Sequence, residues 1–69
     1  MKTTYDKVAD AVYIYLADNK KGNVKKTVRI NENVLIDIGK NDEILGIEIL
    51  GAKKYLNEEE LTKAEKLVA

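Results

Sequence analysis

Hydrophobic and polar residues alternate over much of the first 51 positions, which is the pattern of half-buried β-strands. In AVYIYLA, for example, Val12 and Ile14 point to one side of an extended chain, while Tyr13 and Tyr15 point to the other. Polar turn sequences such as DNKKGN and GKND separate the alternating segments. The pattern predicts about five strands, at roughly residues 2–5, 11–17, 24–30, 34–38 and 43–51.

A helix is the competing interpretation of AVYIYLA. Val8, Val12, Tyr15 and Leu16 also fit a helical stripe, with Asp6 as its N-cap. The β-branched and aromatic composition of the segment favours a strand.

After Ala52 the pattern changes to that of a helix. Asn57 and Glu60 have the spacing of a capping box, and Leu56 and Leu61 have that of a hydrophobic staple. A helix is therefore expected at about residues 58–68. Its narrow apolar stripe consists of Leu61, Ala64, Leu67 and Val68.

The last two strands can be checked against each other. An antiparallel register that pairs Ile38 or Lys40 with Glu43 gives both strands a common apolar face. The sequence thus predicts a single α+β domain, residues 1–69, in which an antiparallel meander of about five strands (1–51) precedes a C-terminal helix (57–68).

The same alternation, extended to all strands, predicts two different sheet faces. The mixed face holds Tyr13, Tyr15, Thr27, Arg29, Leu35, Asp37, Ile44, Gly46, Glu48 and Leu50. One short helix does not cover both faces of five strands, and uncovered apolar sheet is a liability without a partner. We therefore expect a homodimer or another protein partner. The predicted apolar face consists of Val12, Ile14, Leu16, Val24, Val28, Ile30, Val34, Ile36, Ile38, Leu45, Ile47 and Ile49.

Composition narrows the available chemistry. The chain has no cysteine and no histidine, which excludes disulfides and the usual zinc patterns. Without serine as well, no catalytic triad or cysteine dyad can form within one chain. Twelve basic residues balance twelve acidic ones, and neither a secretory leader nor a membrane-spanning run is expected. We expect a cytoplasmic protein.

Two carboxylates on the mixed face are the candidate catalytic residues. Asp37 and Glu48 lie on adjacent predicted strands, with Tyr13 and Tyr15 nearby. Paired carboxylates in a partly apolar setting can divide acid and base roles. A water-facing sheet surface produces the same alternation and is the simpler interpretation.

Hard cations are the only metals that this composition suits. Asp6 and Asp10, together with Asp37 and Glu48, would offer oxygen ligands. Their spacing matches no metal motif, and turn-forming aspartates usually bond their own backbone. We predict no metal and no cofactor.

One basic cluster is free of intervening acids. On a hairpin it would be able to follow phosphates, but no aromatic residue is interleaved and the net charge is zero. Lysines that protect a strand edge explain it equally well, so nucleic acid is not the expected partner. The cluster comprises Lys20, Lys21, Lys25, Lys26 and Arg29.

Two motifs together resemble a known family. TYDKVADAVYIYL and ILGIEILGAKK, with a hydrophobic-Asp strand between them, are similar to the small bacterial and archaeal family called domain of unknown function 2283. The resemblance extends to about Tyr55 and implies a small β-rich fold without an assigned activity. Some members look like partners of toxin-like proteins. The matching positions are Tyr5, Asp6, Asp10, Val12, Tyr13, Ile14, Ile36, Asp37, Gly46, Ile47, Glu48, Ile49 and Leu50.

The leading functional hypothesis is a non-enzymatic interaction module that self-associates or covers a protein partner. Three alternatives remain. They are an antitoxin-like partner of a small toxin, a carboxylate or hard-cation site around Asp37 and Glu48, and a weak nucleic-acid binder using the basic hairpin at 20–29.

Overall fold

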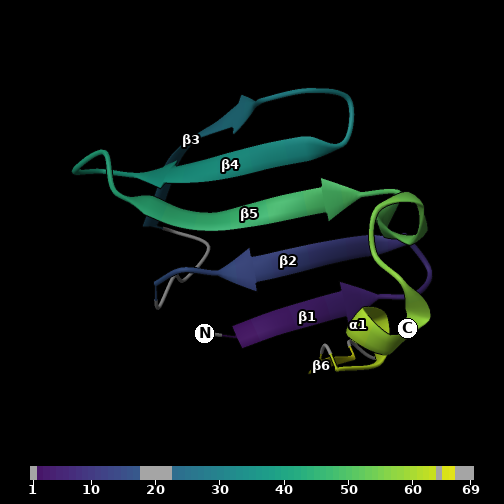
Figure 1. Ribbon diagram of the computed structural model, residues 1–69. Coiled ribbons are helices and arrows are strands. Elements are labelled where there is room, and N and C mark those ends of the chain that lie inside the picture. Colours follow the sequence, from purple (N-terminus) through teal and green to yellow (C-terminus); the bar gives the residue numbers. More distant parts are fainter. Residues whose placement is uncertain (1, 18–22, 64, 67–69) are drawn as a thin grey trace.

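The computed structural model describes residues 2–17, 23–63 and 65–66 (Figure 1). These residues form six strands, one 3-10 turn and one α-helix. The elements are β1 (Lys2–Asp6), β2 (Ala11–Tyr15), β3 (Val24–Arg29), β4 (Val34–Gly39), β5 (Ile44–Leu50), η2 (Ala52–Lys54), α1 (Glu58–Lys63) and β6 (Glu65–Lys66).

All six strands belong to one sheet with the order β3-β4-β5-β2-β1-β6. The first five pair antiparallel, and the two-residue β6 pairs parallel with β1. Pairing of β2 with β5 joins the β1–β2 hairpin to the β3–β4–β5 meander (Figure 1). The predicted fold class is confirmed. The helical interpretation of AVYIYLA is wrong, because this segment pairs with strands on both sides.

The register aligns apolar side chains in rows across one face of the sheet. From Val34 to Asp37, β4 pairs with β5 in the register predicted by pairing Lys40 with Glu43. The predicted relation between the two strands is therefore confirmed over these residues. One row contains Val28, Ile36, Ile47 and Ile14. The neighbouring row contains Val34, Ile49, Val12 and Tyr5.

Two bulges correct the predicted faces. A register shift between Val24 and Lys26 turns Val24 toward the mixed face, although the alternation predicted it on the apolar one. A second shift pairs Ile44 with Ile38, so Ile44 joins the apolar face and not the mixed one. Each bulge adds one residue to a strand, which reverses the parity of every residue beyond it.

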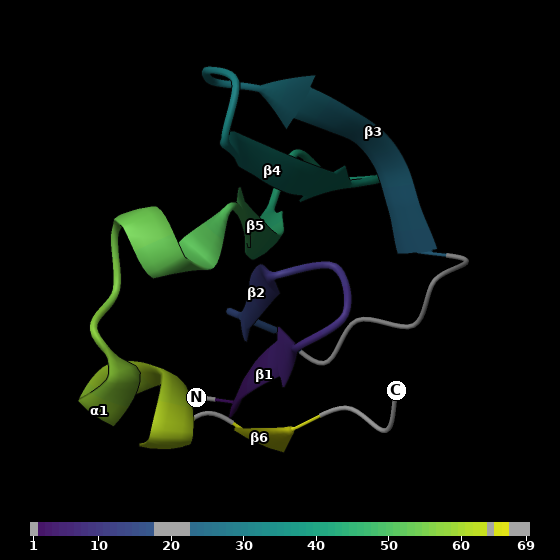
Figure 2. The same ribbon diagram turned by 90° about the vertical axis from the view of Figure 1, so that its right-hand side faces the viewer.

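The closed core lies at one end of the apolar face. Tyr5, Val12, Ala52 and Leu61 form a buried cluster there, and Ile14, Ile49 and Leu56 pack against it. Because η2 and α1 follow directly after β5, they cover only the end of the face near β1 and β2 (Figure 2). In the same view β3 curves toward the opposite side of the sheet.

The α-helix begins as predicted but ends early. The Asn57 side chain accepts a hydrogen bond of 2.9 Å from the Glu60 N–H, as an N-cap does. The prediction of a helix to residue 68 is wrong, because Glu65–Lys66 pairs with the open edge of β1. A helix with one buried leucine, Leu61, has little packing to extend it against that competition. Residues 64, 67 and 68 lie outside the described part of the chain.

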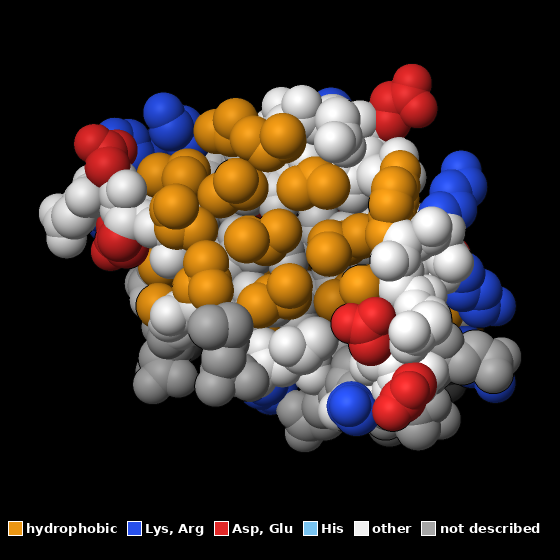
Figure 3. Space-filling model, in the orientation of Figure 1, with side chains coloured by type: hydrophobic (Ala, Val, Ile, Leu, Met, Phe, Trp, Pro, Cys, Tyr) orange, Lys and Arg blue, Asp and Glu red, His pale blue; other side chains and the backbone are white. Residues whose placement is uncertain are grey.

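Much of the apolar face stays uncovered by the described residues. Figure 3 shows hydrophobic side chains gathered over β2, β3, β4 and β5. None of the described helices is long and apolar enough to cross a membrane. We call the uncovered surface the isoleucine face. It consists of Ile14, Val28, Val34, Ile36, Ile38, Ile44, Ile47 and Ile49.

Candidate functional site

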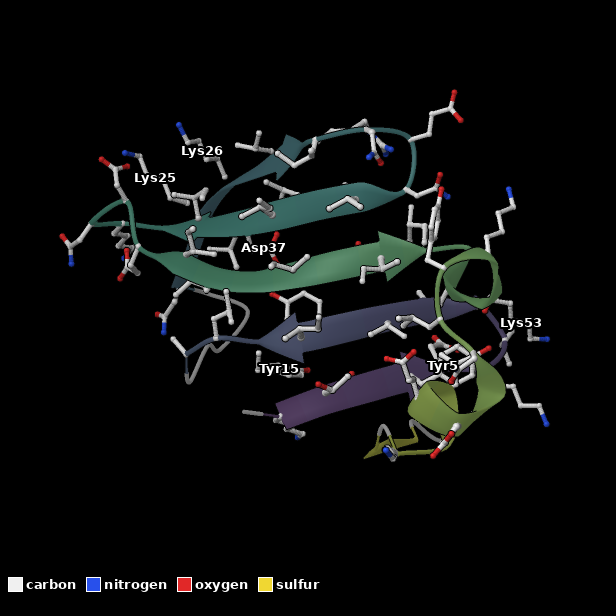
Figure 4. The ribbon with its side chains drawn as sticks, viewed as in Figure 1. Tyr5, Tyr15, Lys25, Lys26, Asp37 and Lys53 are labelled. Carbon is white, nitrogen blue, oxygen red and sulfur yellow. The ribbon has the colours of Figure 1, made fainter. Side chains whose placement is uncertain are left out.

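Asp37 is the centre of a hydrogen-bond network on the mixed face. Its Oδ2 accepts a hydrogen bond of 2.6 Å from the Tyr13 hydroxyl, and its Oδ1 accepts another of 2.6 Å from the Thr27 hydroxyl. Both distances are short, as expected for bonds from hydroxyl groups to a carboxylate. Three strands, β2, β3 and β4, are thereby linked through one side chain. Asp37 is labelled in Figure 4.

Gly46 makes the link between Tyr13 and Asp37 possible. β5 lies between β2 and β4, and Gly46 is the residue of β5 that pairs with Asp37. The Tyr13 ring and hydroxyl occupy the space that a Cβ at position 46 would need. The absent side chain therefore provides the path along which Tyr13 crosses β5.

Glu48 shares this face but takes no part in the network. It lies between Tyr13 of β2 and Leu35 of β4 in the sheet register and is half-buried. Within the described part of the chain, its carboxylate has neither a hydrogen bond nor an ion pair. The register confirms that Asp37, Glu48 and Tyr13 share one face, while a catalytic role for them stays a prediction.

A hollow of about 350 Å³ occupies the concave side of the sheet. The Tyr13 and Tyr15 rings meet edge to face there, with centroids 4.7 Å apart, and the Lys2 ammonium lies 5.3 Å from the Tyr15 centroid. The hollow is thus partly aromatic and partly acidic. Its lining comprises Thr4, Asp6, Ala9, Ala11, Val12, Tyr13, Tyr15, Val24, Asp37, Glu48 and Leu50.

The acidic residues of the β1–β2 turn have structural partners. Asp6 accepts hydrogen bonds of 3.0 and 3.1 Å from the Val8 and Ala9 N–H groups. Asp10, at a positive φ of 51°, accepts a 2.8 Å bond from the Tyr5 hydroxyl. Its backbone carbonyl also accepts a 2.9 Å bond from the Ala52 N–H, which ties η2 to the turn.

The Tyr5–Asp10 bond has an electrostatic consequence. This hydrogen bond raises the pKa of the Tyr5 phenol above its ordinary value of 10.0. Burial of the ring and the negative charges of Asp10 and Asp6 raise the pKa further, because each disfavours a phenolate. Tyr5 therefore keeps its proton, and its bond to Asp10, to higher pH than a free tyrosine.

The described residues contain no group of three or more acidic side chains placed to hold a metal ion. Asp6 and Asp10 instead bond the turn and its neighbours, which is the ordinary role of such aspartates. The motif that begins with Tyr5 and Asp6 and ends with Asp10 therefore has a structural explanation.

The basic residues of β3 do not converge on one surface. Lys25 lies 3.7 Å from the Asp42 carboxylate, and Lys26 pairs in register with Ile38 on the isoleucine face. The Arg29 guanidinium bonds the backbone carbonyls of Asn31 and Glu32 at 3.3 and 3.0 Å. Lys20 and Lys21 lie outside the described residues.

Sequence reasoning did not single out Asn33. Its side-chain amide donates a 2.9 Å hydrogen bond to the Leu50 carbonyl and accepts a 2.8 Å bond from the Tyr55 hydroxyl. It thus fixes the start of β4 to the end of β5 and to the segment after η2. Its place in the polar NEN break between two strands is the one signal that pointed to a turn residue there.

Fold and mixed face together define a small α+β protein built on a curved antiparallel sheet. The family model described as "Protein of unknown function (DUF2283)" matches residues 2–53, so the chain belongs to that family. No curated protein and no solved structure matches the chain. The matched region contains β1 to β5 and most of η2, and leaves out α1 and β6.

Proposed function

We propose that this protein is a non-enzymatic protein-interaction module whose binding surface is the isoleucine face. The observation that carries the proposal is the uncovered row Val28–Ile36–Ile47–Ile14, which crosses four strands without a polar residue. Exposed apolar surface of this kind usually marks a contact with another molecule.

The extent of the face supports this role. The face has three apolar positions on each of β4 and β5 and one on each of β2 and β3. These positions, each about 4.8 by 6.8 Å, together span on the order of 260 Å². That is close to the lower end of the range, about 300–600 Å², in which the largest apolar patch of a monomer is often functional. Val28 and Ile44 remain 38% and 49% exposed when all described residues are counted. This surface is therefore open to a partner.

The mixed face supports a non-enzymatic role. Both oxygens of Asp37 accept hydrogen bonds that brace the sheet, and Tyr13 donates one of them. A base at Asp37 would first have to give up these bonds. The hydrogen-bonded cluster around Asp37 therefore acts as a scaffold for the face on the other side.

The absence of cysteine from the chain allows a direct test of the proposal. Single thiols are introduced as Ile44→Cys on the isoleucine face and as Val8→Cys in the β1–β2 turn. Each is labelled in living cells with a membrane-permeable maleimide. The native residues at positions 44 and 8 are 49% and 78% exposed, which accounts for less than a twofold difference in labelling rate. We expect the thiol at position 44 to react more than about tenfold more slowly than the thiol at position 8. This protection should be lost when the protein is unfolded. Equal labelling of the two thiols in cells would contradict the proposal.

A further inference from the structure

We infer that the hollow on the mixed face is a binding site for a small organic cation, whose alkylammonium group lies between the Glu48 carboxylate and the rings of Tyr13 and Tyr15. This goes beyond the proposed function and is independent of it, because the hollow and the isoleucine face lie on opposite sides of the sheet. Three observations support it: the shape of the hollow, the charge of its lining and two polar groups without a partner.

The hollow owes its shape to the direction of the Tyr13 side chain. Thr4, Tyr13 and Glu48 are cross-strand neighbours in β1, β2 and β5, so their side chains leave the same face of the sheet. Tyr13 reaches over Gly46 to Asp37 and does not fill the space between the other two. The remaining hollow of about 350 Å³ has Thr4 and Glu48 among its walls. Pockets for small ligands begin at about this size, roughly 300 Å³.

The lining of the hollow is negatively charged. Among the described residues that line it, Asp6, Asp37 and Glu48 are acidic and none is basic. Asp6 and Asp37 accept hydrogen bonds from backbone N–H groups and hydroxyls, which are neutral donors and leave both charges uncompensated. A hollow lined by one sign of charge concentrates ligands of the opposite sign, so the expected ligand is a cation.

Two polar groups of the lining have no partner. The half-buried Glu48 carboxylate has neither a hydrogen bond nor an ion pair among the described residues. Thr4 is 2% exposed, and its hydroxyl has no hydrogen bond there either. Since every fully enclosed polar side-chain atom of the described residues has a partner, the Thr4 hydroxyl must open into the hollow. Both oxygens accept hydrogen bonds, and an ammonium group brings three N–H donors.

The tyrosine pair suits an ammonium group and the alkyl chain attached to it. The Tyr13 and Tyr15 rings meet edge to face with their centroids 4.7 Å apart. An ammonium of the chain itself already uses this pair, because the Lys2 Nζ lies 5.3 Å from the Tyr15 centroid. Lys2 is not among the residues that line the hollow, so the acids of the lining are left to a ligand.

A metal ion suits this lining less well than an organic cation. The described residues place no three acidic side chains together as metal ligands. Ala9, Ala11 and Leu50 make much of the lining apolar, and methylene groups gain free energy from burial against such a surface, whereas a hydrated metal ion does not. The ligand is therefore an ammonium on a short alkyl chain, either a free amine or the side chain of a lysine.

Nuclear magnetic resonance titration of the isotope-labelled full chain tests the inference with two amines. Putrescine represents a free amine, and Nα-acetyl-lysine amide represents a lysine side chain. We expect saturable shifts confined to amide signals of the lining, including those of Thr4, Tyr15 and Glu48. The amine that saturates at the lower concentration identifies the source of the ammonium group.

The neutral control is Nα-acetyl-norleucine amide, which keeps the alkyl chain of lysine and lacks its ammonium group. It should shift none of these signals at the same concentration. If neither amine shifts them at about 20 mM, where a site of millimolar affinity is nearly saturated, the inference is overturned. Equal shifts by the lysine and norleucine compounds overturn it as well.

A matched pair of variants tests the role of charge. Glu48→Gln keeps the size of the side chain, removes its charge and should weaken amine binding by at least about tenfold, because a charge-assisted hydrogen bond is lost. Glu32→Gln removes an equal charge from an exposed residue outside the lining and should leave the affinity unchanged. Equal weakening by both changes would mean that the amine responds to net charge alone, which overturns the inference.

Thr4→Val separates binding from folding. Valine keeps the shape of threonine and removes a buried hydroxyl that has no partner, so the free energy of unfolding should not fall. Amine affinity should nevertheless fall several-fold. Circular dichroism checks the folding of each variant. If Glu48→Gln and Thr4→Val both bind the amines as tightly as the wild type, the hollow is not the site and the inference is overturned.

Discussion

Tyr13 donates a 2.6 Å hydrogen bond to Asp37 from two strands away, across the backbone of β5. A tyrosine has the length for this only if the intervening position carries no side chain, and Gly46 meets that condition. The Tyr13–Asp37 bond joins the β1–β2 hairpin to the β3–β4–β5 meander. The family motifs that contain these residues therefore have a structural purpose.

Gly46→Ala should destabilise the fold by about 2–3 kcal/mol. The added methyl group would overlap the Tyr13 ring, so either the ring or β5 must move and the bond to Asp37 is lost. Urea denaturation of the wild type and the variant measures the cost. In a Tyr13→Ala background the same substitution should cost far less, and an equal cost in both backgrounds would show that the ring is not the obstacle.

Tyr13→Phe should cost about 1–2 kcal/mol, because it leaves a partly buried Asp37 oxygen without its donor. Thr27→Val should cost less, because the Thr27–Asp37 bond is exposed and water can replace the hydroxyl. In an Asp37→Asn background the cost of Tyr13→Phe should fall, since a bond to a neutral amide is weaker. Denaturation of the wild type, Tyr13→Phe, Asp37→Asn and the double variant tests this coupling, and strictly additive costs would contradict it.

Alternation predicted the positions of the strands because each has an apolar side and a mixed side. Alternation did not predict the strand order, because pairing of β2 with β5 depends on contacts between residues more than 30 positions apart. The assignments of Val24 and Ile44 to faces failed for another reason. Each comes just before a bulge in its strand, and alternation carries no signal for an inserted residue.

The geometry of the candidate site was likewise predictable only in part. Parity was enough to place Asp37, Glu48 and Tyr13 on one face, and the register confirms it. The bond between Tyr13 and Asp37 was not predictable, because it requires β2 and β4 to flank β5. Glu48, equivalent to Asp37 by pattern, differs from it in having no described side-chain partner.

Tyr5→Phe should destabilise the protein at pH 8 and matter progressively less above pH 10. The raised pKa means that the folded state holds the phenolic proton more tightly than the unfolded chain. The contribution of Tyr5 is therefore fully present below the ordinary pKa of 10.0 and is lost as pH rises through the higher, folded value.

Urea denaturation of the wild type and Tyr5→Phe between pH 8 and 11 measures this change. Every other ionisable group is identical in the two proteins, so the difference between them isolates the contribution of Tyr5. Asp10→Asn is the control, because it removes the charge and weakens the bond that raise the Tyr5 pKa. A stability difference that stays constant, or grows, between pH 8 and 11 would contradict the assignment.

Asn33→Ala should cost about 2 kcal/mol, because it removes the hydrogen bond to the Leu50 carbonyl and the acceptor of the Tyr55 hydroxyl. Tyr55→Phe removes only the second of these bonds. With Tyr55 58% exposed, that change should cost less than 1 kcal/mol. Thermal denaturation followed by circular dichroism distinguishes the two. Equal costs would mean that the bond to Leu50 contributes nothing.

Glu48→Gln should change the free energy of unfolding by less than about 0.5 kcal/mol. The half-buried carboxylate has no hydrogen bond or ion pair among the described residues, so the amide, which is of the same size, removes no contact there.

An interaction module also requires no metal ion at this position. A thermal-shift screen with Mg²⁺ and Ca²⁺ should therefore give the same response for the wild type and Glu48→Gln. Asp37→Asn is unsuitable as the comparison, because it disturbs the bonds from Tyr13 and Thr27. If either metal ion stabilised the wild type and had no effect on Glu48→Gln, the hollow beside Tyr13 and Tyr15 would be a metal-binding site, and the non-enzymatic assignment would have to be revised.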